Sequence, residues 1–66
     1  MTFGEKVKFV RGELQLSQTQ LAQELGISFA TVNRWETRNI EPRYLTQVKF
    51  DKYCEVKGIE FVKSEK

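Results

Sequence analysis

The sequence predicts a small all-α domain of four to five helices, and three observations lead to this fold class. Two capping boxes, Thr2-x-x-Glu5 and Ser17-x-x-Gln20, mark the starts of helices. Apolar residues after each of them recur at helical spacing, not at the alternating spacing of strands. The stretch from Ser17 to Glu36 divides into two short helices joined by one tight turn, which predicts a helix-turn-helix unit.

The first helix is expected to begin at Phe3, directly after the Thr2 cap. Its buried stripe follows the i, i+4, i+7 and i+11 spacing and consists of Phe3, Val7, Val10 and Leu14. Leu16 lies just before the Ser17 cap, so it is expected to pack as a hydrophobic staple at the start of the second helix.

The turn of the helix-turn-helix is expected at Gly26, because glycine tolerates the left-handed conformation that ends a helix. Ser28 then caps the next helix, in which Val32 and Trp35 face inward. The connection is too short for antiparallel packing, so the two helices are expected to cross steeply. The small side chain of Ala22 predicts close helix contact, with Val32 as its partner.

Residues 37–41 are expected to form a loop. Pro42 suits the first position of the following helix, where no backbone N–H is needed. Leu45 and Val48 are predicted to begin the buried stripe of this helix. The sequence leaves open how three aromatic side chains lie, namely Tyr44, Phe50 and Tyr53.

The helix is expected to end near Lys57, with Gly58 as its stop. Ile59 and Phe61 are predicted to fold back onto the core. Residues 59–62 fit a short fifth helix, an extended tail or a dimerising strand, and the sequence does not decide among these. The expected domain covers residues 1–62, followed by a polar tail at residues 63–66.

Length and composition exclude several classes of function. Sixty-six residues allow one domain, and a chain of this size buries only about 60% of its unfolded surface. Cys54 is the single cysteine and histidine is absent, which excludes an internal disulfide and argues against a metal site or a catalytic pair. We expect no enzyme activity, cofactor or small-molecule ligand. No stretch suits a membrane span or a secretory signal, so the expected compartment is the cytoplasm.

The stretch from residue 17 to residue 36 resembles the helix-turn-helix of phage repressors and Cro proteins. The residues that carry the resemblance are Ser17-Gln18, Leu21-Ala22, Leu25-Gly26-Ile27-Ser28, Thr31-Val32 and Arg34-Trp35-Glu36, with Pro42-Arg43-Tyr44-Leu45 after them. The resemblance implies a compact lambda-repressor-like fold. It also implies double-stranded DNA as the partner, and a repressor-like transcriptional regulator of the XRE type as the function.

Early, outward positions of the second helix, residues 28–36, are expected to read base edges in the major groove. The candidates are Ser28, Phe29, Ala30, Thr31, Asn33 and Arg34. Arg34 can give two parallel hydrogen bonds to guanine, and Asn33 can do likewise to adenine. Phe29 is apolar where the resembling repressors often carry a polar residue. It suits contact with thymine methyl groups, and the alternative is packing against the neighbouring protein surface.

Four further residues are candidates for contacts outside the base edges. The resemblance assigns a phosphate contact to Gln18, at the start of its helix. Arg38 and Arg43 are candidates for phosphate or minor-groove contact. Arg38 stands where the family often has glycine, so the loop is expected to turn at Asn39, which completes this set.

A structural ion pair between Arg11 and Glu36 is also implied by the resemblance. Two other functions stay open: the DNA-targeting module of a restriction-modification or toxin-antitoxin system, and a protein-interaction module that has lost DNA binding. Gln18, Asn33 and Arg34 argue against the last of these. The oligomeric state stays open. Domains of this type usually bind as dimers over two half-sites, and any dimer surface is expected in the C-terminal part of the chain.

Overall fold

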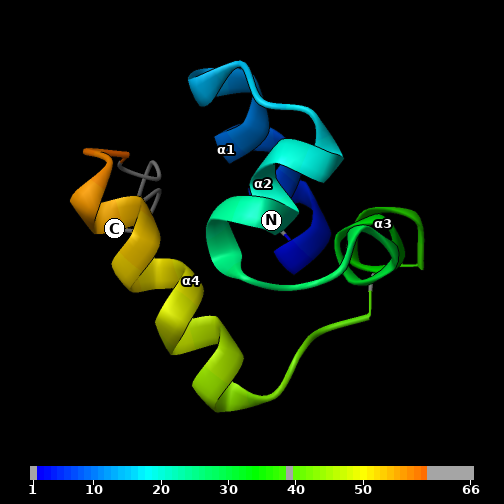
Figure 1. The fold of residues 1–66 in the computed structure, drawn as a ribbon. Helices are drawn as coiled ribbons and strands as arrows, with labels where there is room; N and C mark the ends of the chain where they lie inside the picture. The colour runs from blue at the N-terminus through cyan, green and yellow to red at the C-terminus, as the bar shows by residue number, and fades with distance from the viewer. Residues whose placement is uncertain (1, 39, 60–66) are drawn as a thin grey trace.

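The computed structural model describes residues 2–38 and 40–59, and every regular element in these ranges is a helix. In chain order they are α1 (Phe3–Leu14), α2 (Gln18–Leu25), α3 (Phe29–Arg38) and α4 (Tyr44–Val56), as Figure 1 shows. The predicted all-α fold class and the first four helices are therefore confirmed.

Both predicted capping boxes are present. The Thr2 hydroxyl accepts from the Glu5 N–H at 3.2 Å, and the Glu5 carboxylate accepts from the Thr2 N–H at 2.8 Å. Ser17 and Gln20 exchange the same two bonds at 3.0 and 2.8 Å. Each box satisfies two backbone donors that a helix start leaves free, and α1 and α2 begin where the sequence predicts.

α1 and α2 both end in the left-handed conformation, and the sequence predicts it only for α2. Gly26 closes α2 with a φ of 72°, as expected. Gln15 closes α1 with a φ of 57°, which is unusual for a residue with a side chain. The bond from the Leu16 N–H to the Arg11 carbonyl, at 2.9 Å, completes this helix end.

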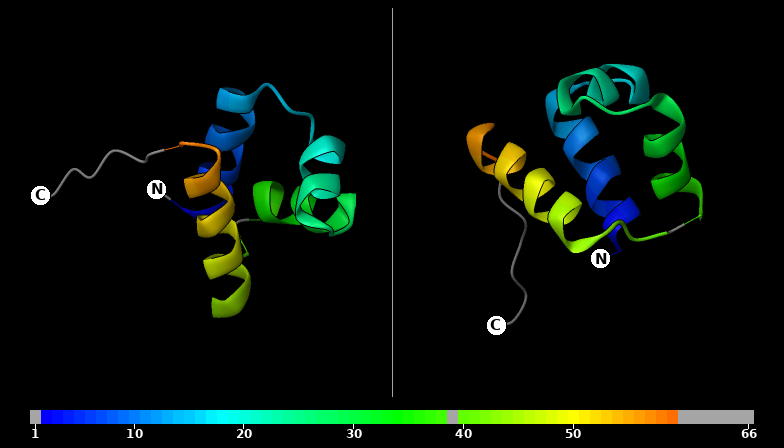
Figure 2. Two further views of the ribbon diagram at one scale, coloured as in Figure 1. Left: turned by 60° about the vertical axis from the view of Figure 1, so that its left-hand side comes forward. Right: turned by 60° about the horizontal axis from the view of Figure 1, so that its bottom comes forward.

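The core lies where α3 packs against both α1 and α2. Figure 2 shows the short helices α2 and α3 crossing steeply beside α1. Val7, Val10 and Val32 are fully buried, and the Phe3 and Trp35 rings meet edge to face with centroids 5.0 Å apart. This packing presents one long side of α3 to α1 and α2 and leaves the opposite side outside the core.

α4 begins two residues later than predicted. Arg43 is its N-cap, with an extended backbone at φ −61° and ψ 157°, and the Gln47 N–H donates to the Arg43 carbonyl at 3.0 Å. The Gln47 side chain also donates to the Pro42 carbonyl at 2.8 Å. These bonds hold Pro42 in the connection before the helix, so the prediction that Pro42 is the first helical residue is wrong.

The buried face of α4 also differs from the prediction. Leu45 is 78% exposed and Val48 is 43% exposed, whereas Phe50 and Cys54 are 1% and 2% exposed. At 100° per residue, Leu45 and Val48 lie roughly 140° and 160° around the helix from Phe50. Because α4 turns its Phe50 side to the core, the prediction that Leu45 and Val48 are buried is wrong.

Aromatic and polar contacts attach α4 to the other helices. The Phe50 and Phe3 rings pack with centroids 5.1 Å apart. Nearer the end of α4, the Tyr53 hydroxyl donates to Glu24 on α2 at 2.8 Å, and the Lys57 amine lies 3.5 Å from the same carboxylate. α4 is thereby tied to both α1 and α2.

The end of α4 agrees with the prediction. Gly58 adopts a φ of 75°, and the Ile59 N–H donates to the Cys54 carbonyl at 2.9 Å. Ile59 is partly buried and packs against the core, as expected. The predictions for residues 60–66, Phe61 included, lie outside the described residues.

Candidate nucleic-acid interface

The start of α3 is fixed by Ser28. Its hydroxyl accepts from the Thr31 N–H at 3.2 Å and lies 2.9 Å from the Thr31 hydroxyl. Ser28 thus acts as the expected N-cap. The Ser28 and Thr31 hydroxyls are hydrogen-bonded to each other.

α3 extends two residues beyond the predicted helix, through Thr37 to Arg38. The Thr37 hydroxyl donates to the Asn33 carbonyl, one turn earlier, at 2.8 Å. This bond satisfies the threonine side chain within the helix, so the prediction that the loop begins at Thr37 is wrong. Asn39, the expected turning point of the loop, lies outside the described residues.

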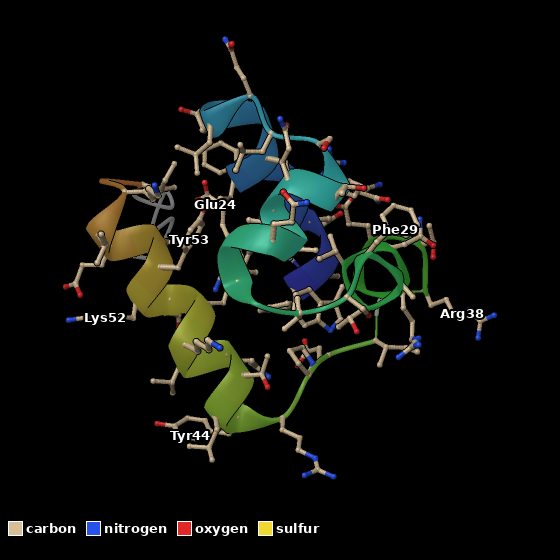
Figure 3. The ribbon with its side chains drawn as sticks, in the orientation of Figure 1. Glu24, Phe29, Arg38, Tyr44, Lys52 and Tyr53 are labelled. Atoms are coloured by element: carbon tan, nitrogen blue, oxygen red, sulfur yellow. The ribbon has the colours of Figure 1, made fainter. Side chains whose placement is uncertain are left out.

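The outer side of α3 is exposed and mixes apolar with basic side chains. Phe29 is 50% exposed, and Ala30, Arg34 and Arg38 are exposed as well. Figure 3 shows Phe29 and Arg38 on the side of the molecule away from Glu24. An exposed helix surface that carries both basic and apolar side chains suits a negatively charged, groove-shaped partner.

On the inner side of α3, Arg11 and Glu36 come together. The Arg11 Nε donates to Glu36 Oε2 at 2.7 Å, and its Nη2 donates to Oε1 at 2.8 Å. The third guanidinium nitrogen donates to the Leu16 carbonyl at 3.1 Å. The Glu36 side chain is only 2% exposed and that of Arg11 is 25% exposed. The Arg11–Glu36 ion pair therefore joins α1, the following turn and α3.

This pairing determines the charge state of Glu36. Burial by itself raises the pKa of its carboxyl, but hydrogen bonds from Arg11 and Gln18 and the Arg11 charge together outweigh that effect. The pKa of Glu36 therefore lies below its ordinary value. The hydrogen bond with Glu36 raises the pKa of Arg11. The pair is fully ionised at neutral pH.

The polar cluster continues to the start of α2. The Gln18 Nε2 donates to Glu36 Oε1 at 3.1 Å, and the Asn33 Nδ2 donates to Gln18 Oε1, also at 3.1 Å. Sequence reasoning treated Gln18 and Asn33 as separate contacts to DNA and missed their pairing. The sequence feature that indicates a shared cluster is the three-residue spacing of Asn33 and Glu36, which places both side chains on one side of α3.

Other chemistry has little support in the part of the chain that the structure describes. No group of three or more metal-ligating side chains occurs in residues 2–38 and 40–59. Cys54 is buried, and burial raises the pKa of its thiol to about 11, so it is not a thiolate at neutral pH. None of the helices described here is long and apolar enough to cross a membrane.

Comparison with known proteins agrees with this arrangement. The model of the protein family described as Helix-turn-helix matches residues 7–61. Searches of curated proteins and of solved structures find no match. The family match covers most of α1 and all of α2, α3 and α4, and therefore both the exposed side of α3 and the polar cluster beneath it.

Proposed function

Because the chain belongs to the helix-turn-helix family of Cro and phage-repressor type, whose domains are DNA-binding regulators, we propose that it binds double-stranded DNA sequence-specifically. It acts as a repressor-like transcriptional regulator in the cytoplasm. The observation that carries this proposal is the two-sided character of α3, which buries Val32, Trp35 and Glu36 and exposes Phe29 and Arg34.

The exposed side of α3 enters the major groove. Arg34 offers a planar guanidinium that reaches guanine O6 and N7 together. Phe29 and Ala30 contact thymine methyl groups, which are the apolar feature of that groove. Ser28 and Thr31 stand at the start of α3, where their hydroxyls can exchange their mutual bond for one to a base edge.

Contacts to the sugar–phosphate backbone orient the domain. Gln18 starts α2, where free backbone N–H groups and the positive end of the helix dipole favour a phosphate. Arg38 and Arg43 are exposed at the end of α3 and before α4, and they contact phosphate or the minor groove. Asn39 lies between them in sequence and belongs to the same proposed contact set.

The protein binds as a homodimer, because one recognition helix reads only a few base pairs. The contact surface is the outer side of α4, where Tyr44, Leu45 and Val48 are 77%, 78% and 43% exposed. Antiparallel pairing of two α4 helices with Leu45 against Val48 of the second copy also sets Tyr44 opposite Lys49. That places an aromatic ring against a cation at both ends of the contact.

The test of base reading compares Arg34→Ala with Arg38→Ala, since both variants remove one exposed arginine from α3. Arg34→Ala should cost about 1–3 kcal/mol on the preferred site and relax the choice at one base pair. Arg38→Ala should weaken binding to all duplexes about equally. Bound sequences are selected from random duplexes by each protein at one salt concentration. If Arg34→Ala recovers the wild-type site with equal discrimination at every position, Arg34 does not read bases.

A further inference from the structure

The buried Glu36 carboxylate fixes the orientation of two side-chain amides. A carboxylate only accepts hydrogen bonds, so the Gln18 amide must turn its Nε2 towards Glu36, 3.1 Å away. The Gln18 Oε1 then faces Asn33, which must present its own Nδ2 at 3.1 Å. The direction of both bonds therefore follows from the ionised state of Glu36.

Among residues 2–38 and 40–59, this arrangement leaves one Nε2 hydrogen of Gln18 without a partner. Gln18 is the first residue of α2, and its side chain is partly exposed. Phe29 and Ala30, at the start of α3, have no polar side-chain atom with which to orient the amide. Two side chains of α3 bond to the Gln18 amide: Glu36 accepts from its Nε2, and Asn33 donates to its Oε1.

We propose that Asn33 is a positioning residue, which holds the Gln18 amide with its remaining Nε2 hydrogen directed at a DNA phosphate. The inference rests on the proposed function and adds to it a role for Asn33 that differs from base reading. Asn33 is partly buried and engaged with Gln18, whereas Arg34 beside it is exposed. Its effect on binding is transmitted through Gln18 and is the same for every DNA sequence.

The experiment is a double-mutant cycle with Gln18→Ala, Asn33→Ala and both together, measured on the preferred site and on an unrelated duplex. Gln18→Ala should weaken binding to both duplexes about tenfold, because a hydrogen bond to a charged group is lost. Asn33→Ala should weaken both by about fivefold, since the Gln18 amide keeps its bond to Glu36 but loses the bond that holds its Oε1. The double variant should bind no more weakly than Gln18→Ala alone.

Two controls separate positioning from other effects. Gln23→Ala removes an exposed glutamine from α2 and should leave binding unchanged. Because the Gln18 amide is uncharged, Asn33→Ala should lower affinity without changing the slope of log K against log salt. Circular dichroism of each variant checks that the helices persist.

Three results would overturn the inference: independent, additive losses in the cycle, a changed base preference in Asn33→Ala, or no binding of any duplex. If the wild type shows no preference for any site but the double-mutant cycle still gives the expected result on the unrelated duplex, only the proposed sequence specificity is refuted. If Asn33→Ala fails to fold, nuclear magnetic resonance of the wild type decides. The Asn33 side-chain amide protons must then show contacts to the Gln18 side chain, and their absence refutes the positioning role.

Discussion

Replacing Glu36 by glutamine should destabilise the fold strongly while changing its shape little. The carboxylate accepts two hydrogen bonds from Arg11 and one from Gln18, at 2.7, 2.8 and 3.1 Å. A glutamine amide keeps one oxygen but turns an NH₂ group towards these donors. The Arg11 guanidinium then loses its counter-ion, and at least one donor of the cluster loses its acceptor.

The magnitude follows from burial. Removing one partner of a fully buried ion pair costs about 3–5 kcal/mol. The Glu36 side chain is 2% exposed but that of Arg11 is 25% exposed, so water can partly solvate the orphaned cation. We expect a loss of about 2–3 kcal/mol. A chain of 66 residues has a total stability of about 3–10 kcal/mol, so this loss is a large share. The melting temperature should fall by about 10–20 °C.

The destabilisation should depend on pH. The folded-state pKa of Glu36 lies below its ordinary value of 4.5. The stability that its ionisation contributes is therefore present above pH 4.5 and is lost as the pH falls through the lower, folded-state pKa. The difference in unfolding free energy between wild type and Glu36→Gln should be constant at neutral pH. It should narrow below about pH 4.5.

Urea denaturation, followed by the fluorescence of the buried Trp35, measures these free energies. The matched control is Glu24→Gln, which removes the same charge from a side chain that is 39% exposed. That control should cost much less than Glu36→Gln, because water screens an exposed carboxylate. Equal losses for Glu36→Gln and Glu24→Gln, or a difference from wild type that widens at low pH, would refute the reasoning.

Two further predictions concern α1 and α4. Gln15→Gly should stabilise the protein by about 0.5–1 kcal/mol in urea denaturation, because Gln15 ends α1 at a φ of 57° where glycine is relaxed; an unchanged or lower midpoint would contradict this. Leu45→Glu should abolish dimerisation on DNA in sedimentation velocity and leave monomer stability within about 0.5 kcal/mol, because the side chain is 78% exposed. A wild type that is monomeric on its preferred duplex would reject the α4 contact surface.

Local signals predicted the helix-turn-helix well. The bonds that start α1 and α2 form between residues three apart, so the sequence shows them directly. The helix ends at Gly26 and Gly58 can likewise be predicted from the local sequence, because a left-handed helix end favours glycine. Gln15 adopts the same conformation without the glycine that would have revealed it, which explains why the end of α1 carried no such signal.

Predictions that depended on tertiary packing succeeded less often. Which side of α4 faces the core is decided by the contact between Phe50 and Phe3, 47 residues apart in the chain. The apolar residues of α4 lie on more than one side, so periodicity alone could not choose between Leu45 and Phe50. The bond between Gln18 and Asn33 joins two helices. The sequence indicates a DNA contact for each of these side chains separately but not a bond between them.

The two sides of α3 differ in how well they tolerate amino-acid substitutions. On the inner side, Glu36 binds donors from two other segments, so a substitution there disturbs three elements together. On the outer side, Phe29 is half exposed and Arg34 is exposed, so a substitution there costs little packing. The inner cluster holds α3 at one angle to α1 and α2, whichever side chains occupy its outer side. In the proposed interface, sequence preference can therefore change at Phe29 and Arg34 without loss of the fold, whereas we expect a change at Asn33 to alter the affinity for every duplex through Gln18.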